Sequence, residues 1–413
     1  MGKRTWLSRP QTMAMQPTTY QPRDSLWLIL SLFIGFRLMM LMAWPADTLT
    51  RYGDYQYYYN LAALSEIGLL PFLDYWSEYP PIFPFLSVAL YQLGGGLFKN
   101  YALLLSLTML VFETGGLVLL YRMASEIRDR SQATWVSGVY VALFIPVLIW
   151  LGTFEAMAAF LVLLTLFALR RRQLWLTGIA IGLGAAIKVL PILLLVTIWR
   201  TRGWRPALVS GLFALLVCLV VLAPLLILSP DYTLASLQSQ ASKSSWQTVW
   251  ALLDGNTANT GIFGPVADHF DPAKARNQLY NPSRVPAWLT LIPFALLGLF
   301  IFTRPVLRHA DDPFIFAALT FTVFFLWAKG WSPQWQLFLV PLILLSLPLQ
   351  RAVLFVLALG FINLLEWPIL LSRGLTELLP LTIVARTIVL VLLGWELYQQ
   401  MTRLPEPTGA ANG

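Results

Sequence analysis

Long apolar runs recur along this chain from Leu26 to Leu397, and they limit its possible folds more than any other feature. A helix that crosses a bilayer needs about 20 predominantly apolar residues. Only 12% of the residues are charged, which is about half the share in an ordinary soluble protein. The sequence therefore predicts an all-α polytopic membrane protein with about 11–13 transmembrane helices. The candidate spans are 25–44, 101–121, 132–150, 156–169, 174–187, 189–199, 206–228, 286–303, 313–328, 334–349, 352–371 and 379–399.

The order of these segments divides the chain into five parts. No small-residue cleavage site follows the first apolar segment, so we interpret it as a retained span and not as a signal peptide. We expect a cytoplasmic N-terminal tail (1–24), a first transmembrane module (25–228) with an outer loop (45–100), a second outer loop (229–285), C-terminal transmembrane helices (286–400) and a disordered cytoplasmic tail (401–413).

The positions of the basic residues decide whether segment 80–97 crosses the membrane. Short cytoplasmic loops are enriched in Lys and Arg. If 80–97 crosses, the arginine clusters at 122–130 and 170–172 fall outside, and if it does not, both lie in the cytoplasm. Pro80, Pro81 and Pro84 also disfavour a crossing, because each proline removes a backbone donor that lipid cannot replace. We therefore predict a helix at 80–97 that lies on the outer face.

This threading places the polar residues of chemical interest on one face of the membrane. The net charge of +8 arises from basic residues at the ends of spans, so no nucleic-acid partner is expected. A single cysteine, Cys218, excludes an intramolecular disulfide. Asp268, His269 and Asp271 form only a small cluster, so we expect no required metal or other cofactor, with a divalent cation as the alternative. The residues on the outer face are Asp54, Asp74, Glu78, Glu155, Lys188, Trp246, Asp254 and Lys329.

Two acidic residues of the outer face are candidates for chemistry. Asp54 lies in the first outer loop, where partial desolvation raises the basicity of a carboxylate and suits it to act as a general base. Its alternative role is to cap the helix that follows. Glu155 follows the end of a predicted span and can bind a hydroxyl-rich ligand or cap the next helix.

Lys188 is a sharper candidate, because it interrupts the apolar run AAIKVLPILLL. A buried ammonium in a membrane is costly and commonly functional. Pro191 predicts a break in the helix that exposes backbone donors beside the cation, and a lipid-borne phosphate is the natural partner. The alternative is a lysine that reaches the interface with its ammonium. Arg37, within the first span, is a second candidate for binding such a lipid-borne phosphate.

Aromatic and amide side chains gather in two outer loops, 241–256 and 326–341. Such residues can stack on sugar rings and bond their hydroxyls, although tryptophans also collect at membrane interfaces. In the first outer loop, Glu78 and Tyr79 are candidates for positioning an acceptor beside an apolar groove near 80–97. The candidates for binding the acceptor or the sugar are Asp74, Glu78, Tyr79, Glu155, Trp246, Asp254, Lys329, Gln334 and Trp335.

The order of these motifs resembles the GT-C superfamily of polyprenyl-phosphate-sugar-dependent glycosyltransferases. The resemblance is greatest to glycosyltransferase family 87 and to GPI mannosyltransferase I. Two positions depart from the family pattern: the chain has Tyr52-Gly53-Asp54 where some relatives have Asp-x-Asp, and Glu155 where Asp is more common. The matching motifs are Asp54, EYPP at 78–81, Glu155, IKVLP at 187–191, SSWQTVWALLDGN at 244–256 and SPQW at 332–335.

The resemblance implies a GT-C fold and an acidic residue at Asp54 that acts as the catalytic base or anchors the acceptor. It also implies that the chain transfers a sugar, mannose, from a polyprenyl phosphosugar to a hydroxyl of a lipid or glycan acceptor. The transfer would invert the anomeric configuration. We expect a multi-pass protein of the cell membrane that works as a monomer among membrane lipids. Its active site would face the periplasm or the exterior, or the lumen in a eukaryote. The alternatives are a transporter or lipid flippase, and a non-catalytic subunit of an envelope complex.

Overall fold

The computed structural model describes residues 22–43, 50, 53–143, 152–261, 264–277, 279–305 and 313–402. Within these ranges the chain is helical, and its only β-type pairings are two isolated bridges. Tyr52, residues 144–150 of one predicted span, and most of both predicted tails lie outside the described residues.

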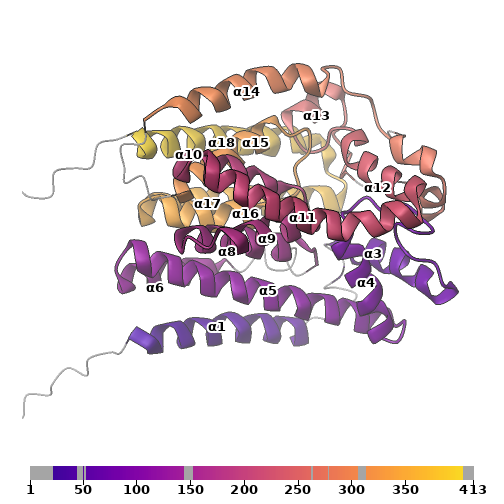
Figure 1. Cartoon of the computed structure of the whole chain (residues 1–413), viewed down its shortest axis with the longest axis horizontal. Coiled ribbons are helices and arrows are strands. Elements are labelled where there is room, and N and C mark those ends of the chain that lie inside the picture. The colour runs from indigo at the N-terminus through magenta and orange to yellow at the C-terminus, as the bar shows by residue number, and fades with distance from the viewer. Residues whose placement is uncertain are drawn as a thin grey trace, which may run out of the picture.

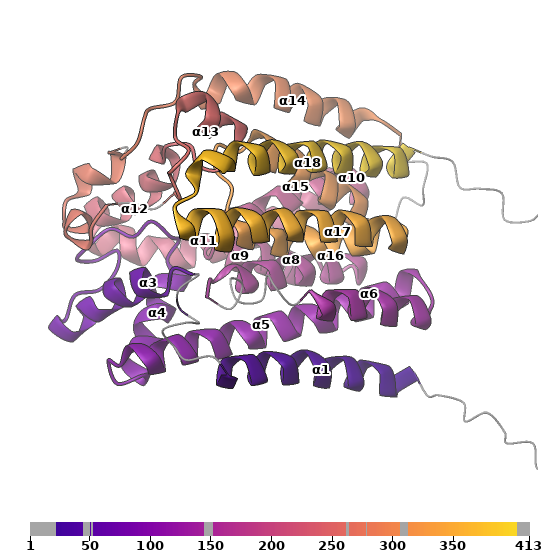
Figure 2. The same cartoon turned by 180° about the vertical axis from the view of Figure 1, so that it is seen from behind.

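The helices run side by side in one bundle (Figures 1 and 2). Five helical stretches are long and apolar enough to cross a membrane: Ser25–Ala43 in α1, Phe98–Ile127, Trp204–Leu228, Leu349–Arg373 and Thr376–Thr402. This confirms the prediction of an all-α polytopic membrane protein. The bounds are α1 (Pro22–Ala43), α5 (Phe98–Ile127), α6 (Arg130–Ala142), α8 (Glu155–Arg170), α9 (Leu174–Ala185), α10 (Leu194–Arg202), α11 (Trp204–Leu228), α14 (Ala287–Thr303), α15 (Pro313–Trp327), α16 (Gln336–Ser346), α17 (Leu349–Leu364) and α18 (Leu379–Thr402).

The end of the bundle where α1 begins and α18 ends lies on the left in Figure 1. Arginines at helix ends join helices that are distant in the sequence. The arrangement agrees with a threading in which 80–97 does not cross, since the arginine clusters then share one end. The contacts are Arg128 with the carbonyls of Leu345 and Leu347, Glu126 with Arg170 and Arg171, Arg200 with the carbonyl of Arg304, and Arg351 with Glu396.

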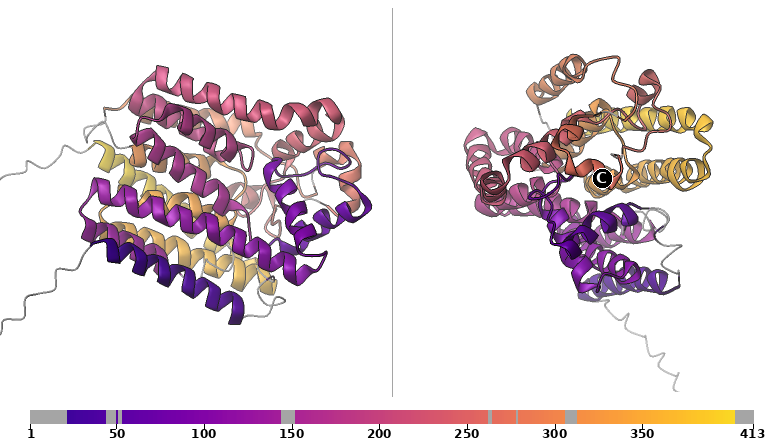
Figure 3. Two further views of the ribbon diagram at one scale, coloured as in Figure 1. Left: turned by 60° about the horizontal axis from the view of Figure 1, so that its bottom comes forward. Right: turned by 90° about the vertical axis from the view of Figure 1, so that its right-hand side faces the viewer.

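The opposite end of the bundle, called here the loop end, is built from short helices: α3 (Tyr55–Ala62), α4 (Ile82–Leu93), α12 (Pro230–Ser242) and α13 (Val249–Asp254). The 12 residues of α4 extend about 18 Å, which is too short to cross the membrane. Segment 80–97 is therefore a short helix at this end, packed on α3 and α5. Seen from the loop end (Figure 3, right), the N-terminal and C-terminal helices occupy different sides of the bundle.

Two arginines are buried between membrane helices, and each pairs with a glutamate. The Arg37 Nε atom on α1 lies 3.1 Å from Glu113 Oε2 on α5, and both side chains are only 1% exposed. Arg386 on α18 pairs with Glu366 in the π-helical turn Leu365–Leu370 that follows α17. Burying a charge in apolar surroundings is costly unless it is paired. Separating either pair would expose that cost, so each pair links the two helical segments that carry it.

We expect Arg37→Met to destabilise the protein, because it leaves the Glu113 carboxylate buried without its partner. The loss in the free energy of unfolding should be about 3–5 kcal/mol. Adding Glu113→Met should recover most of that loss, since no unpaired charge then remains. Thermal unfolding of the purified protein in detergent measures both variants. A double variant that is less stable than Arg37→Met alone would contradict the coupling.

Candidate functional site

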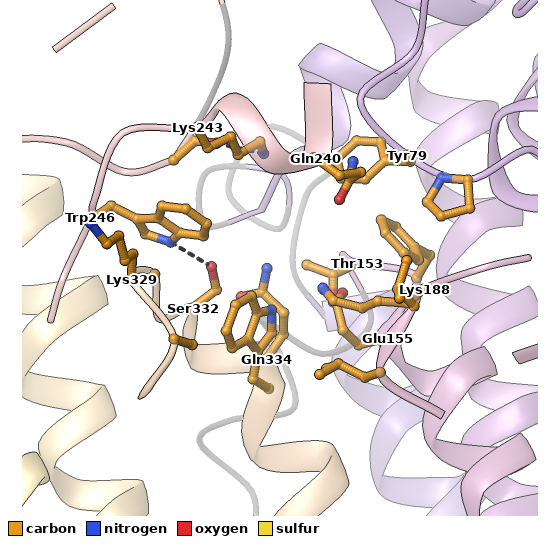
Figure 4. A pocket seen from close by; sticks show the side chains of 18 of the residues that line it. Tyr79, Thr153, Glu155, Lys188, Gln240, Lys243, Trp246, Lys329, Ser332 and Gln334 are labelled. Carbon is orange, nitrogen blue, oxygen red and sulfur yellow. Dashed lines mark hydrogen bonds and ion pairs between the residues drawn. The ribbon is translucent and has the colours of Figure 1, made fainter. Parts of the chain in front are cut away.

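A cavity of about 500 Å³ opens at the loop end (Figure 4). Its walls come from the loop before α3, the loop before α8, the break between α9 and α10, the end of α12 with the following loop, and the turn after α15. Segments far apart in the sequence therefore converge on one space. The cavity brings together eight of the residues predicted from the sequence: Asp54, Tyr79, Glu155, Lys188, Trp246, Lys329, Gln334 and Trp335.

Lys188 lies in a break between two helices. The helix α9 ends at Ala185, and a 3-10 turn with Pro191 near its start occupies Leu190–Leu193 before α10 begins. A Cβ on Gly184 would lie 2.8 Å from the Pro191 ring, so glycine permits this close approach. The predicted helix break is confirmed. The ammonium that it presents lies 2.5 Å from Glu155 Oε1 and 4.9 Å from the centroid of the Trp335 ring.

Asp54 immediately precedes α3. Its backbone carbonyl accepts from the Tyr58 N–H at 2.9 Å, but its side chain makes no capping hydrogen bond. The Tyr58 hydroxyl instead donates to Asp54 Oδ2 at 3.1 Å. A Cβ on Gly152 would lie 2.4 Å from the Tyr55 ring, so the loops that carry Asp54 and Glu155 pack closely because of a glycine. The carboxylate is therefore oriented by Tyr58 and remains on the cavity wall.

Burial raises the pKa of Asp54 to about 6. The negative charges of Glu155 and Glu78 contribute to the increase, whereas the Tyr58 hydrogen bond and the Lys243 ammonium oppose it. A carboxylate with a pKa near the working pH both remains ionised and accepts a proton more readily than an exposed aspartate. Asp54 thus has the environment of a general base.

Lys243 is a cavity residue to which sequence reasoning assigned no role. Its ammonium lies 2.5 Å from Glu78 Oε2 and donates to the Gly261 carbonyl at 2.7 Å. Glu78 is fully buried and does not itself line the cavity. The Lys243 ammonium also lies 5.5 Å from the Trp246 ring centroid. Its position within the aromatic outer loop 241–256 was the available signal in the sequence, but the pairing with Glu78 spans 165 residues.

Trp246 forms a rigid part of the wall. Its backbone N–H donates to the Lys329 carbonyl at 3.0 Å, and its indole N–H donates to Ser332 Oγ at 3.2 Å (Figure 4). A Cβ on Gly330 would lie 2.1 Å from the Trp246 ring. The Lys329 ammonium donates at 2.5 Å to the carbonyl of Val285, which does not line the cavity. Lys329 therefore helps to hold the loop.

Besides Glu78, three predicted site residues lie outside the cavity lining. Arg37 pairs with Glu113 within the bundle, which corrects its expected role at a donor phosphate. Asp74 Oδ2 accepts from the Leu70 N–H at 2.8 Å and stabilises a turn. Asp254 accepts from the Ser245 hydroxyl at 2.6 Å and from the Arg284 N–H at 2.8 Å, so it joins two loops. Both carboxylates therefore already accept hydrogen bonds from donors of the surrounding loops.

The apolar wall of the cavity also differs from the expectation. Among residues 80–97 only Pro80 lines it. The apolar lining comes instead from Val189, from the 3-10 turn Leu190–Leu193 and from the end of α15, and Val189 and Ile192 are exposed. An apolar groove therefore adjoins Lys188 and not α4, because α4 packs against α3 and α5. The residues of this apolar wall are Val189, Leu190, Ile192, Leu193, Phe324 and Trp327.

The cluster around His269 is engaged within the loop end. His269 stacks on Trp76 at a centroid distance of 4.0 Å, its Nδ1 bonds the Trp76 carbonyl at 2.7 Å, and its Nε2 lies 3.1 Å from the Tyr57 hydroxyl. Asp268 pairs with Lys274. Among the described residues there is no group of three or more His, Cys, Asp or Glu side chains that could hold a metal ion.

Comparisons with known proteins connect the chain to one family. The profile described as "Glycosyltransferase family 87" matches residues 76–328. No curated protein sequence is similar enough to count as a match. Two crystal structures of the Archaeoglobus fulgidus oligosaccharyltransferase are similar in outline: the apo form (TM-score 0.46, 11% identity) and a complex with Zn and sulfate (TM-score 0.38, 13% identity). The alignments cover 94% and 93% of this chain but only 57% and 54% of those proteins.

We expect Gly330→Ala to displace Trp246, because the added methyl group would lie 2.1 Å from its ring. The unfolding temperature should fall by several degrees, as for other overpacking substitutions of about 1–3 kcal/mol. Gly360→Ala, in α17 with open space around the new Cβ, is the matched control and should not destabilise. Equal unfolding temperatures for the two variants would show that Trp246 is not held tightly.

Proposed function

This chain belongs to glycosyltransferase family 87, and we propose that it moves mannose from a polyprenyl-phosphate-linked donor to a hydroxyl of a lipid or glycan acceptor. The transfer would invert the anomeric configuration and take place on the non-cytoplasmic side of the membrane. The proposal rests above all on one observation: a carboxylate with a pKa of about 6, Asp54, shares a cavity with the Lys188–Glu155 pair and an apolar wall. The family assignment favours transfer over transport.

In the proposed reaction, Asp54 is the general base. The acceptor oxygen forms a bond to the anomeric carbon while the bond from that carbon to the donor phosphate oxygen breaks on the opposite face. The acceptor proton passes to Asp54, and the electron pair leaves with polyprenyl monophosphate. Lys188 would stabilise the charge that develops on this phosphate, as preorganised cations do at a transition state.

The donor phosphate must share or take over the Lys188 ammonium, which now contacts Glu155. A charge-assisted bond to phosphate can offset the loss of the carboxylate contact. The isoprenoid chain would lie along the apolar wall beside Lys188, where Val189 and Ile192 are exposed. Such a position keeps water away from the reacting carbon and thus protects the donor from hydrolysis.

The polar wall of the cavity supports binding of sugar hydroxyls. The Lys243 ammonium, held by the buried Glu78 carboxylate, can donate to a hydroxyl beside the rings of Tyr79 and Trp246. Gln334 presents its amide to the same space (Figure 4). We propose that these residues orient the sugar and the acceptor, while Asp74 and Asp254 act only by shaping the loops.

Asp54→Asn should reduce transfer by at least about 100-fold, because the amide cannot accept the acceptor proton. Asp74→Asn is the matched control. Asp74 belongs to the same outer loop, but it lies outside the cavity lining and its carboxylate accepts a hydrogen bond from the Leu70 backbone N–H. Transfer from polyprenyl phosphomannose, followed by mass spectrometry, measures both. Turnover of Asp54→Asn within about 3-fold of the unmodified protein would exclude this base.

The transfer rate should fall as the pH decreases through about 6, because a general base works only when deprotonated and the pKa of Asp54 is about 6. Tyr58→Phe removes a hydrogen bond that lowers this pKa, so the acid limb should move to higher pH. Glu155→Gln removes a negative charge that raises it, and the limb should move to lower pH. The pH dependence of kcat/KM measures each shift, and shifts of the opposite signs would contradict the assignment.

A further inference from the structure

The buried Arg386–Glu366 pair lies beyond the part of the chain that matches the family profile, yet it reaches the cavity wall. Arg386 is 2% exposed and Glu366 is 1% exposed. The second guanidinium nitrogen of Arg386, Nη2, donates to the backbone carbonyl of Gln247, the residue after Trp246. The pair therefore connects the C-terminal helices to a loop that lines the cavity.

Gln247 has an unfavourable conformation that needs support. Its φ is +49°, in the left-handed region that residues with a side chain rarely adopt. Its side chain is 1% exposed, and neither its amide nitrogen nor its amide oxygen has a hydrogen-bond partner among the described residues. Both features are costly and persist only where the surroundings enforce them. The hydrogen bond from Arg386 to the Gln247 carbonyl is such a constraint.

Arg386 also supports the segment opposite Gln247. Its guanidinium lies 4.9 Å from the centroid of the Trp331 ring. The backbone N–H of Trp331 donates to the Trp246 carbonyl at 3.1 Å, next to the bridge between Trp246 and Gly330. One side chain thus contacts both of the segments whose pairing places the Trp246 ring on the cavity wall.

Glu366 extends the same arrangement to a second wall residue. It belongs to the π-helical turn Leu365–Leu370, and the next residue, Trp367, lines the cavity. Turns of π-helix often occur at functional sites. The ion pair with Arg386 holds this turn against α18. Trp246 and Trp367 are therefore both positioned relative to a single buried ion pair.

We propose that Arg386 and Glu366 are positioning residues that hold the Trp246 and Trp367 walls of the cavity in the geometry needed to bind the substrate. The C-terminal helices then take part in substrate binding without touching the substrate. This inference rests on the proposed function only for its kinetic consequence, because the local order of residues 245–250 is a property of the protein alone.

Hydrogen exchange followed by mass spectrometry tests the proposal on the full chain in detergent. Arg386→Met should increase exchange at least about 10-fold in residues 245–250 and 329–332, because the clamp on the Gln247 carbonyl is lost. Arg37→Met is the matched control, since it removes an equally buried arginine from a pair with glutamate on two other helices, α1 and α5. It should increase exchange in α1 and α5 but leave the two wall segments unchanged.

Kinetics on the same variants provide the second readout. Per folded molecule, Arg386→Met should raise the apparent KM for polyprenyl phosphomannose about 10-fold and change kcat by less than about 3-fold, since the wall is displaced and Asp54 is not. Arg386→Lys should rescue part of the loss, because one ammonium can bond either the Glu366 carboxylate or the Gln247 carbonyl. The Arg37→Met control should keep the KM of the unmodified protein.

Gln247→Gly provides an independent variant if Arg386→Met does not fold. Glycine adopts a φ of +49° without strain, so it should stabilise the protein and reduce the exchange penalty of Arg386→Lys. Unchanged exchange of residues 245–250 in Arg386→Met, or in Arg386→Lys if only that variant folds, would overturn the inference. Absence of transfer by the unmodified protein would refute the proposed function alone, since the exchange result stands without it.

Discussion

The contact between the Lys188 ammonium and the Glu155 carboxylate is the interaction around which the site is organised. A lysine within an apolar stretch is tolerated only if its charge is matched, and Glu155 supplies the match from the first residue of α8. The break in the helix after Ala185 makes room for this ammonium, and the glycine at position 152 brings the Glu155 loop against the Asp54 loop. The carboxylate that neutralises this partly buried cation therefore also acts on the base, since its negative charge is one of those that raise the pKa of Asp54.

Neutralisation by ion pairs also explains how the bundle is tied together. Pairs of arginine and glutamate link α1 to α5 and α18 to the turn after α17, whereas pairs of lysine and glutamate gather at the cavity. Arginine can bond two partners in a fixed geometry, which suits a permanent link between helices. The ammonium of lysine is a compact charge on a flexible stem, which suits a group that must exchange a carboxylate for a ligand.

Much of the fold and of the site follows from local features of the sequence. Apolar runs predict the helices, and the prolines before α4 with the distribution of arginines place the acidic loop residues at one end. The break at Lys188 follows from Pro191, which cannot continue the preceding helix. Pairings between distant residues do not follow from such arguments, so Lys243 was missed and Arg37 was given the wrong partner. Asp74 and Asp254 have the chemistry of site residues, but neighbouring backbone and hydroxyl donors satisfy them, and only the folded loops determine that outcome.

The proposed reaction keeps the total charge of the cavity constant. A donor phosphodiester carries one negative charge and becomes a monoester with two as its bond to the sugar breaks. Asp54 loses its negative charge in the same step, because it takes the acceptor proton. In a buried site, where separated charges interact strongly, a step that created net charge would be opposed. The carboxylates near Asp54 raise its affinity for a proton, and the Lys188 ammonium is placed to receive the second phosphate charge. Proton uptake by the base and departure of the phosphate therefore favour each other electrostatically, which is why the base and the cation must share one cavity.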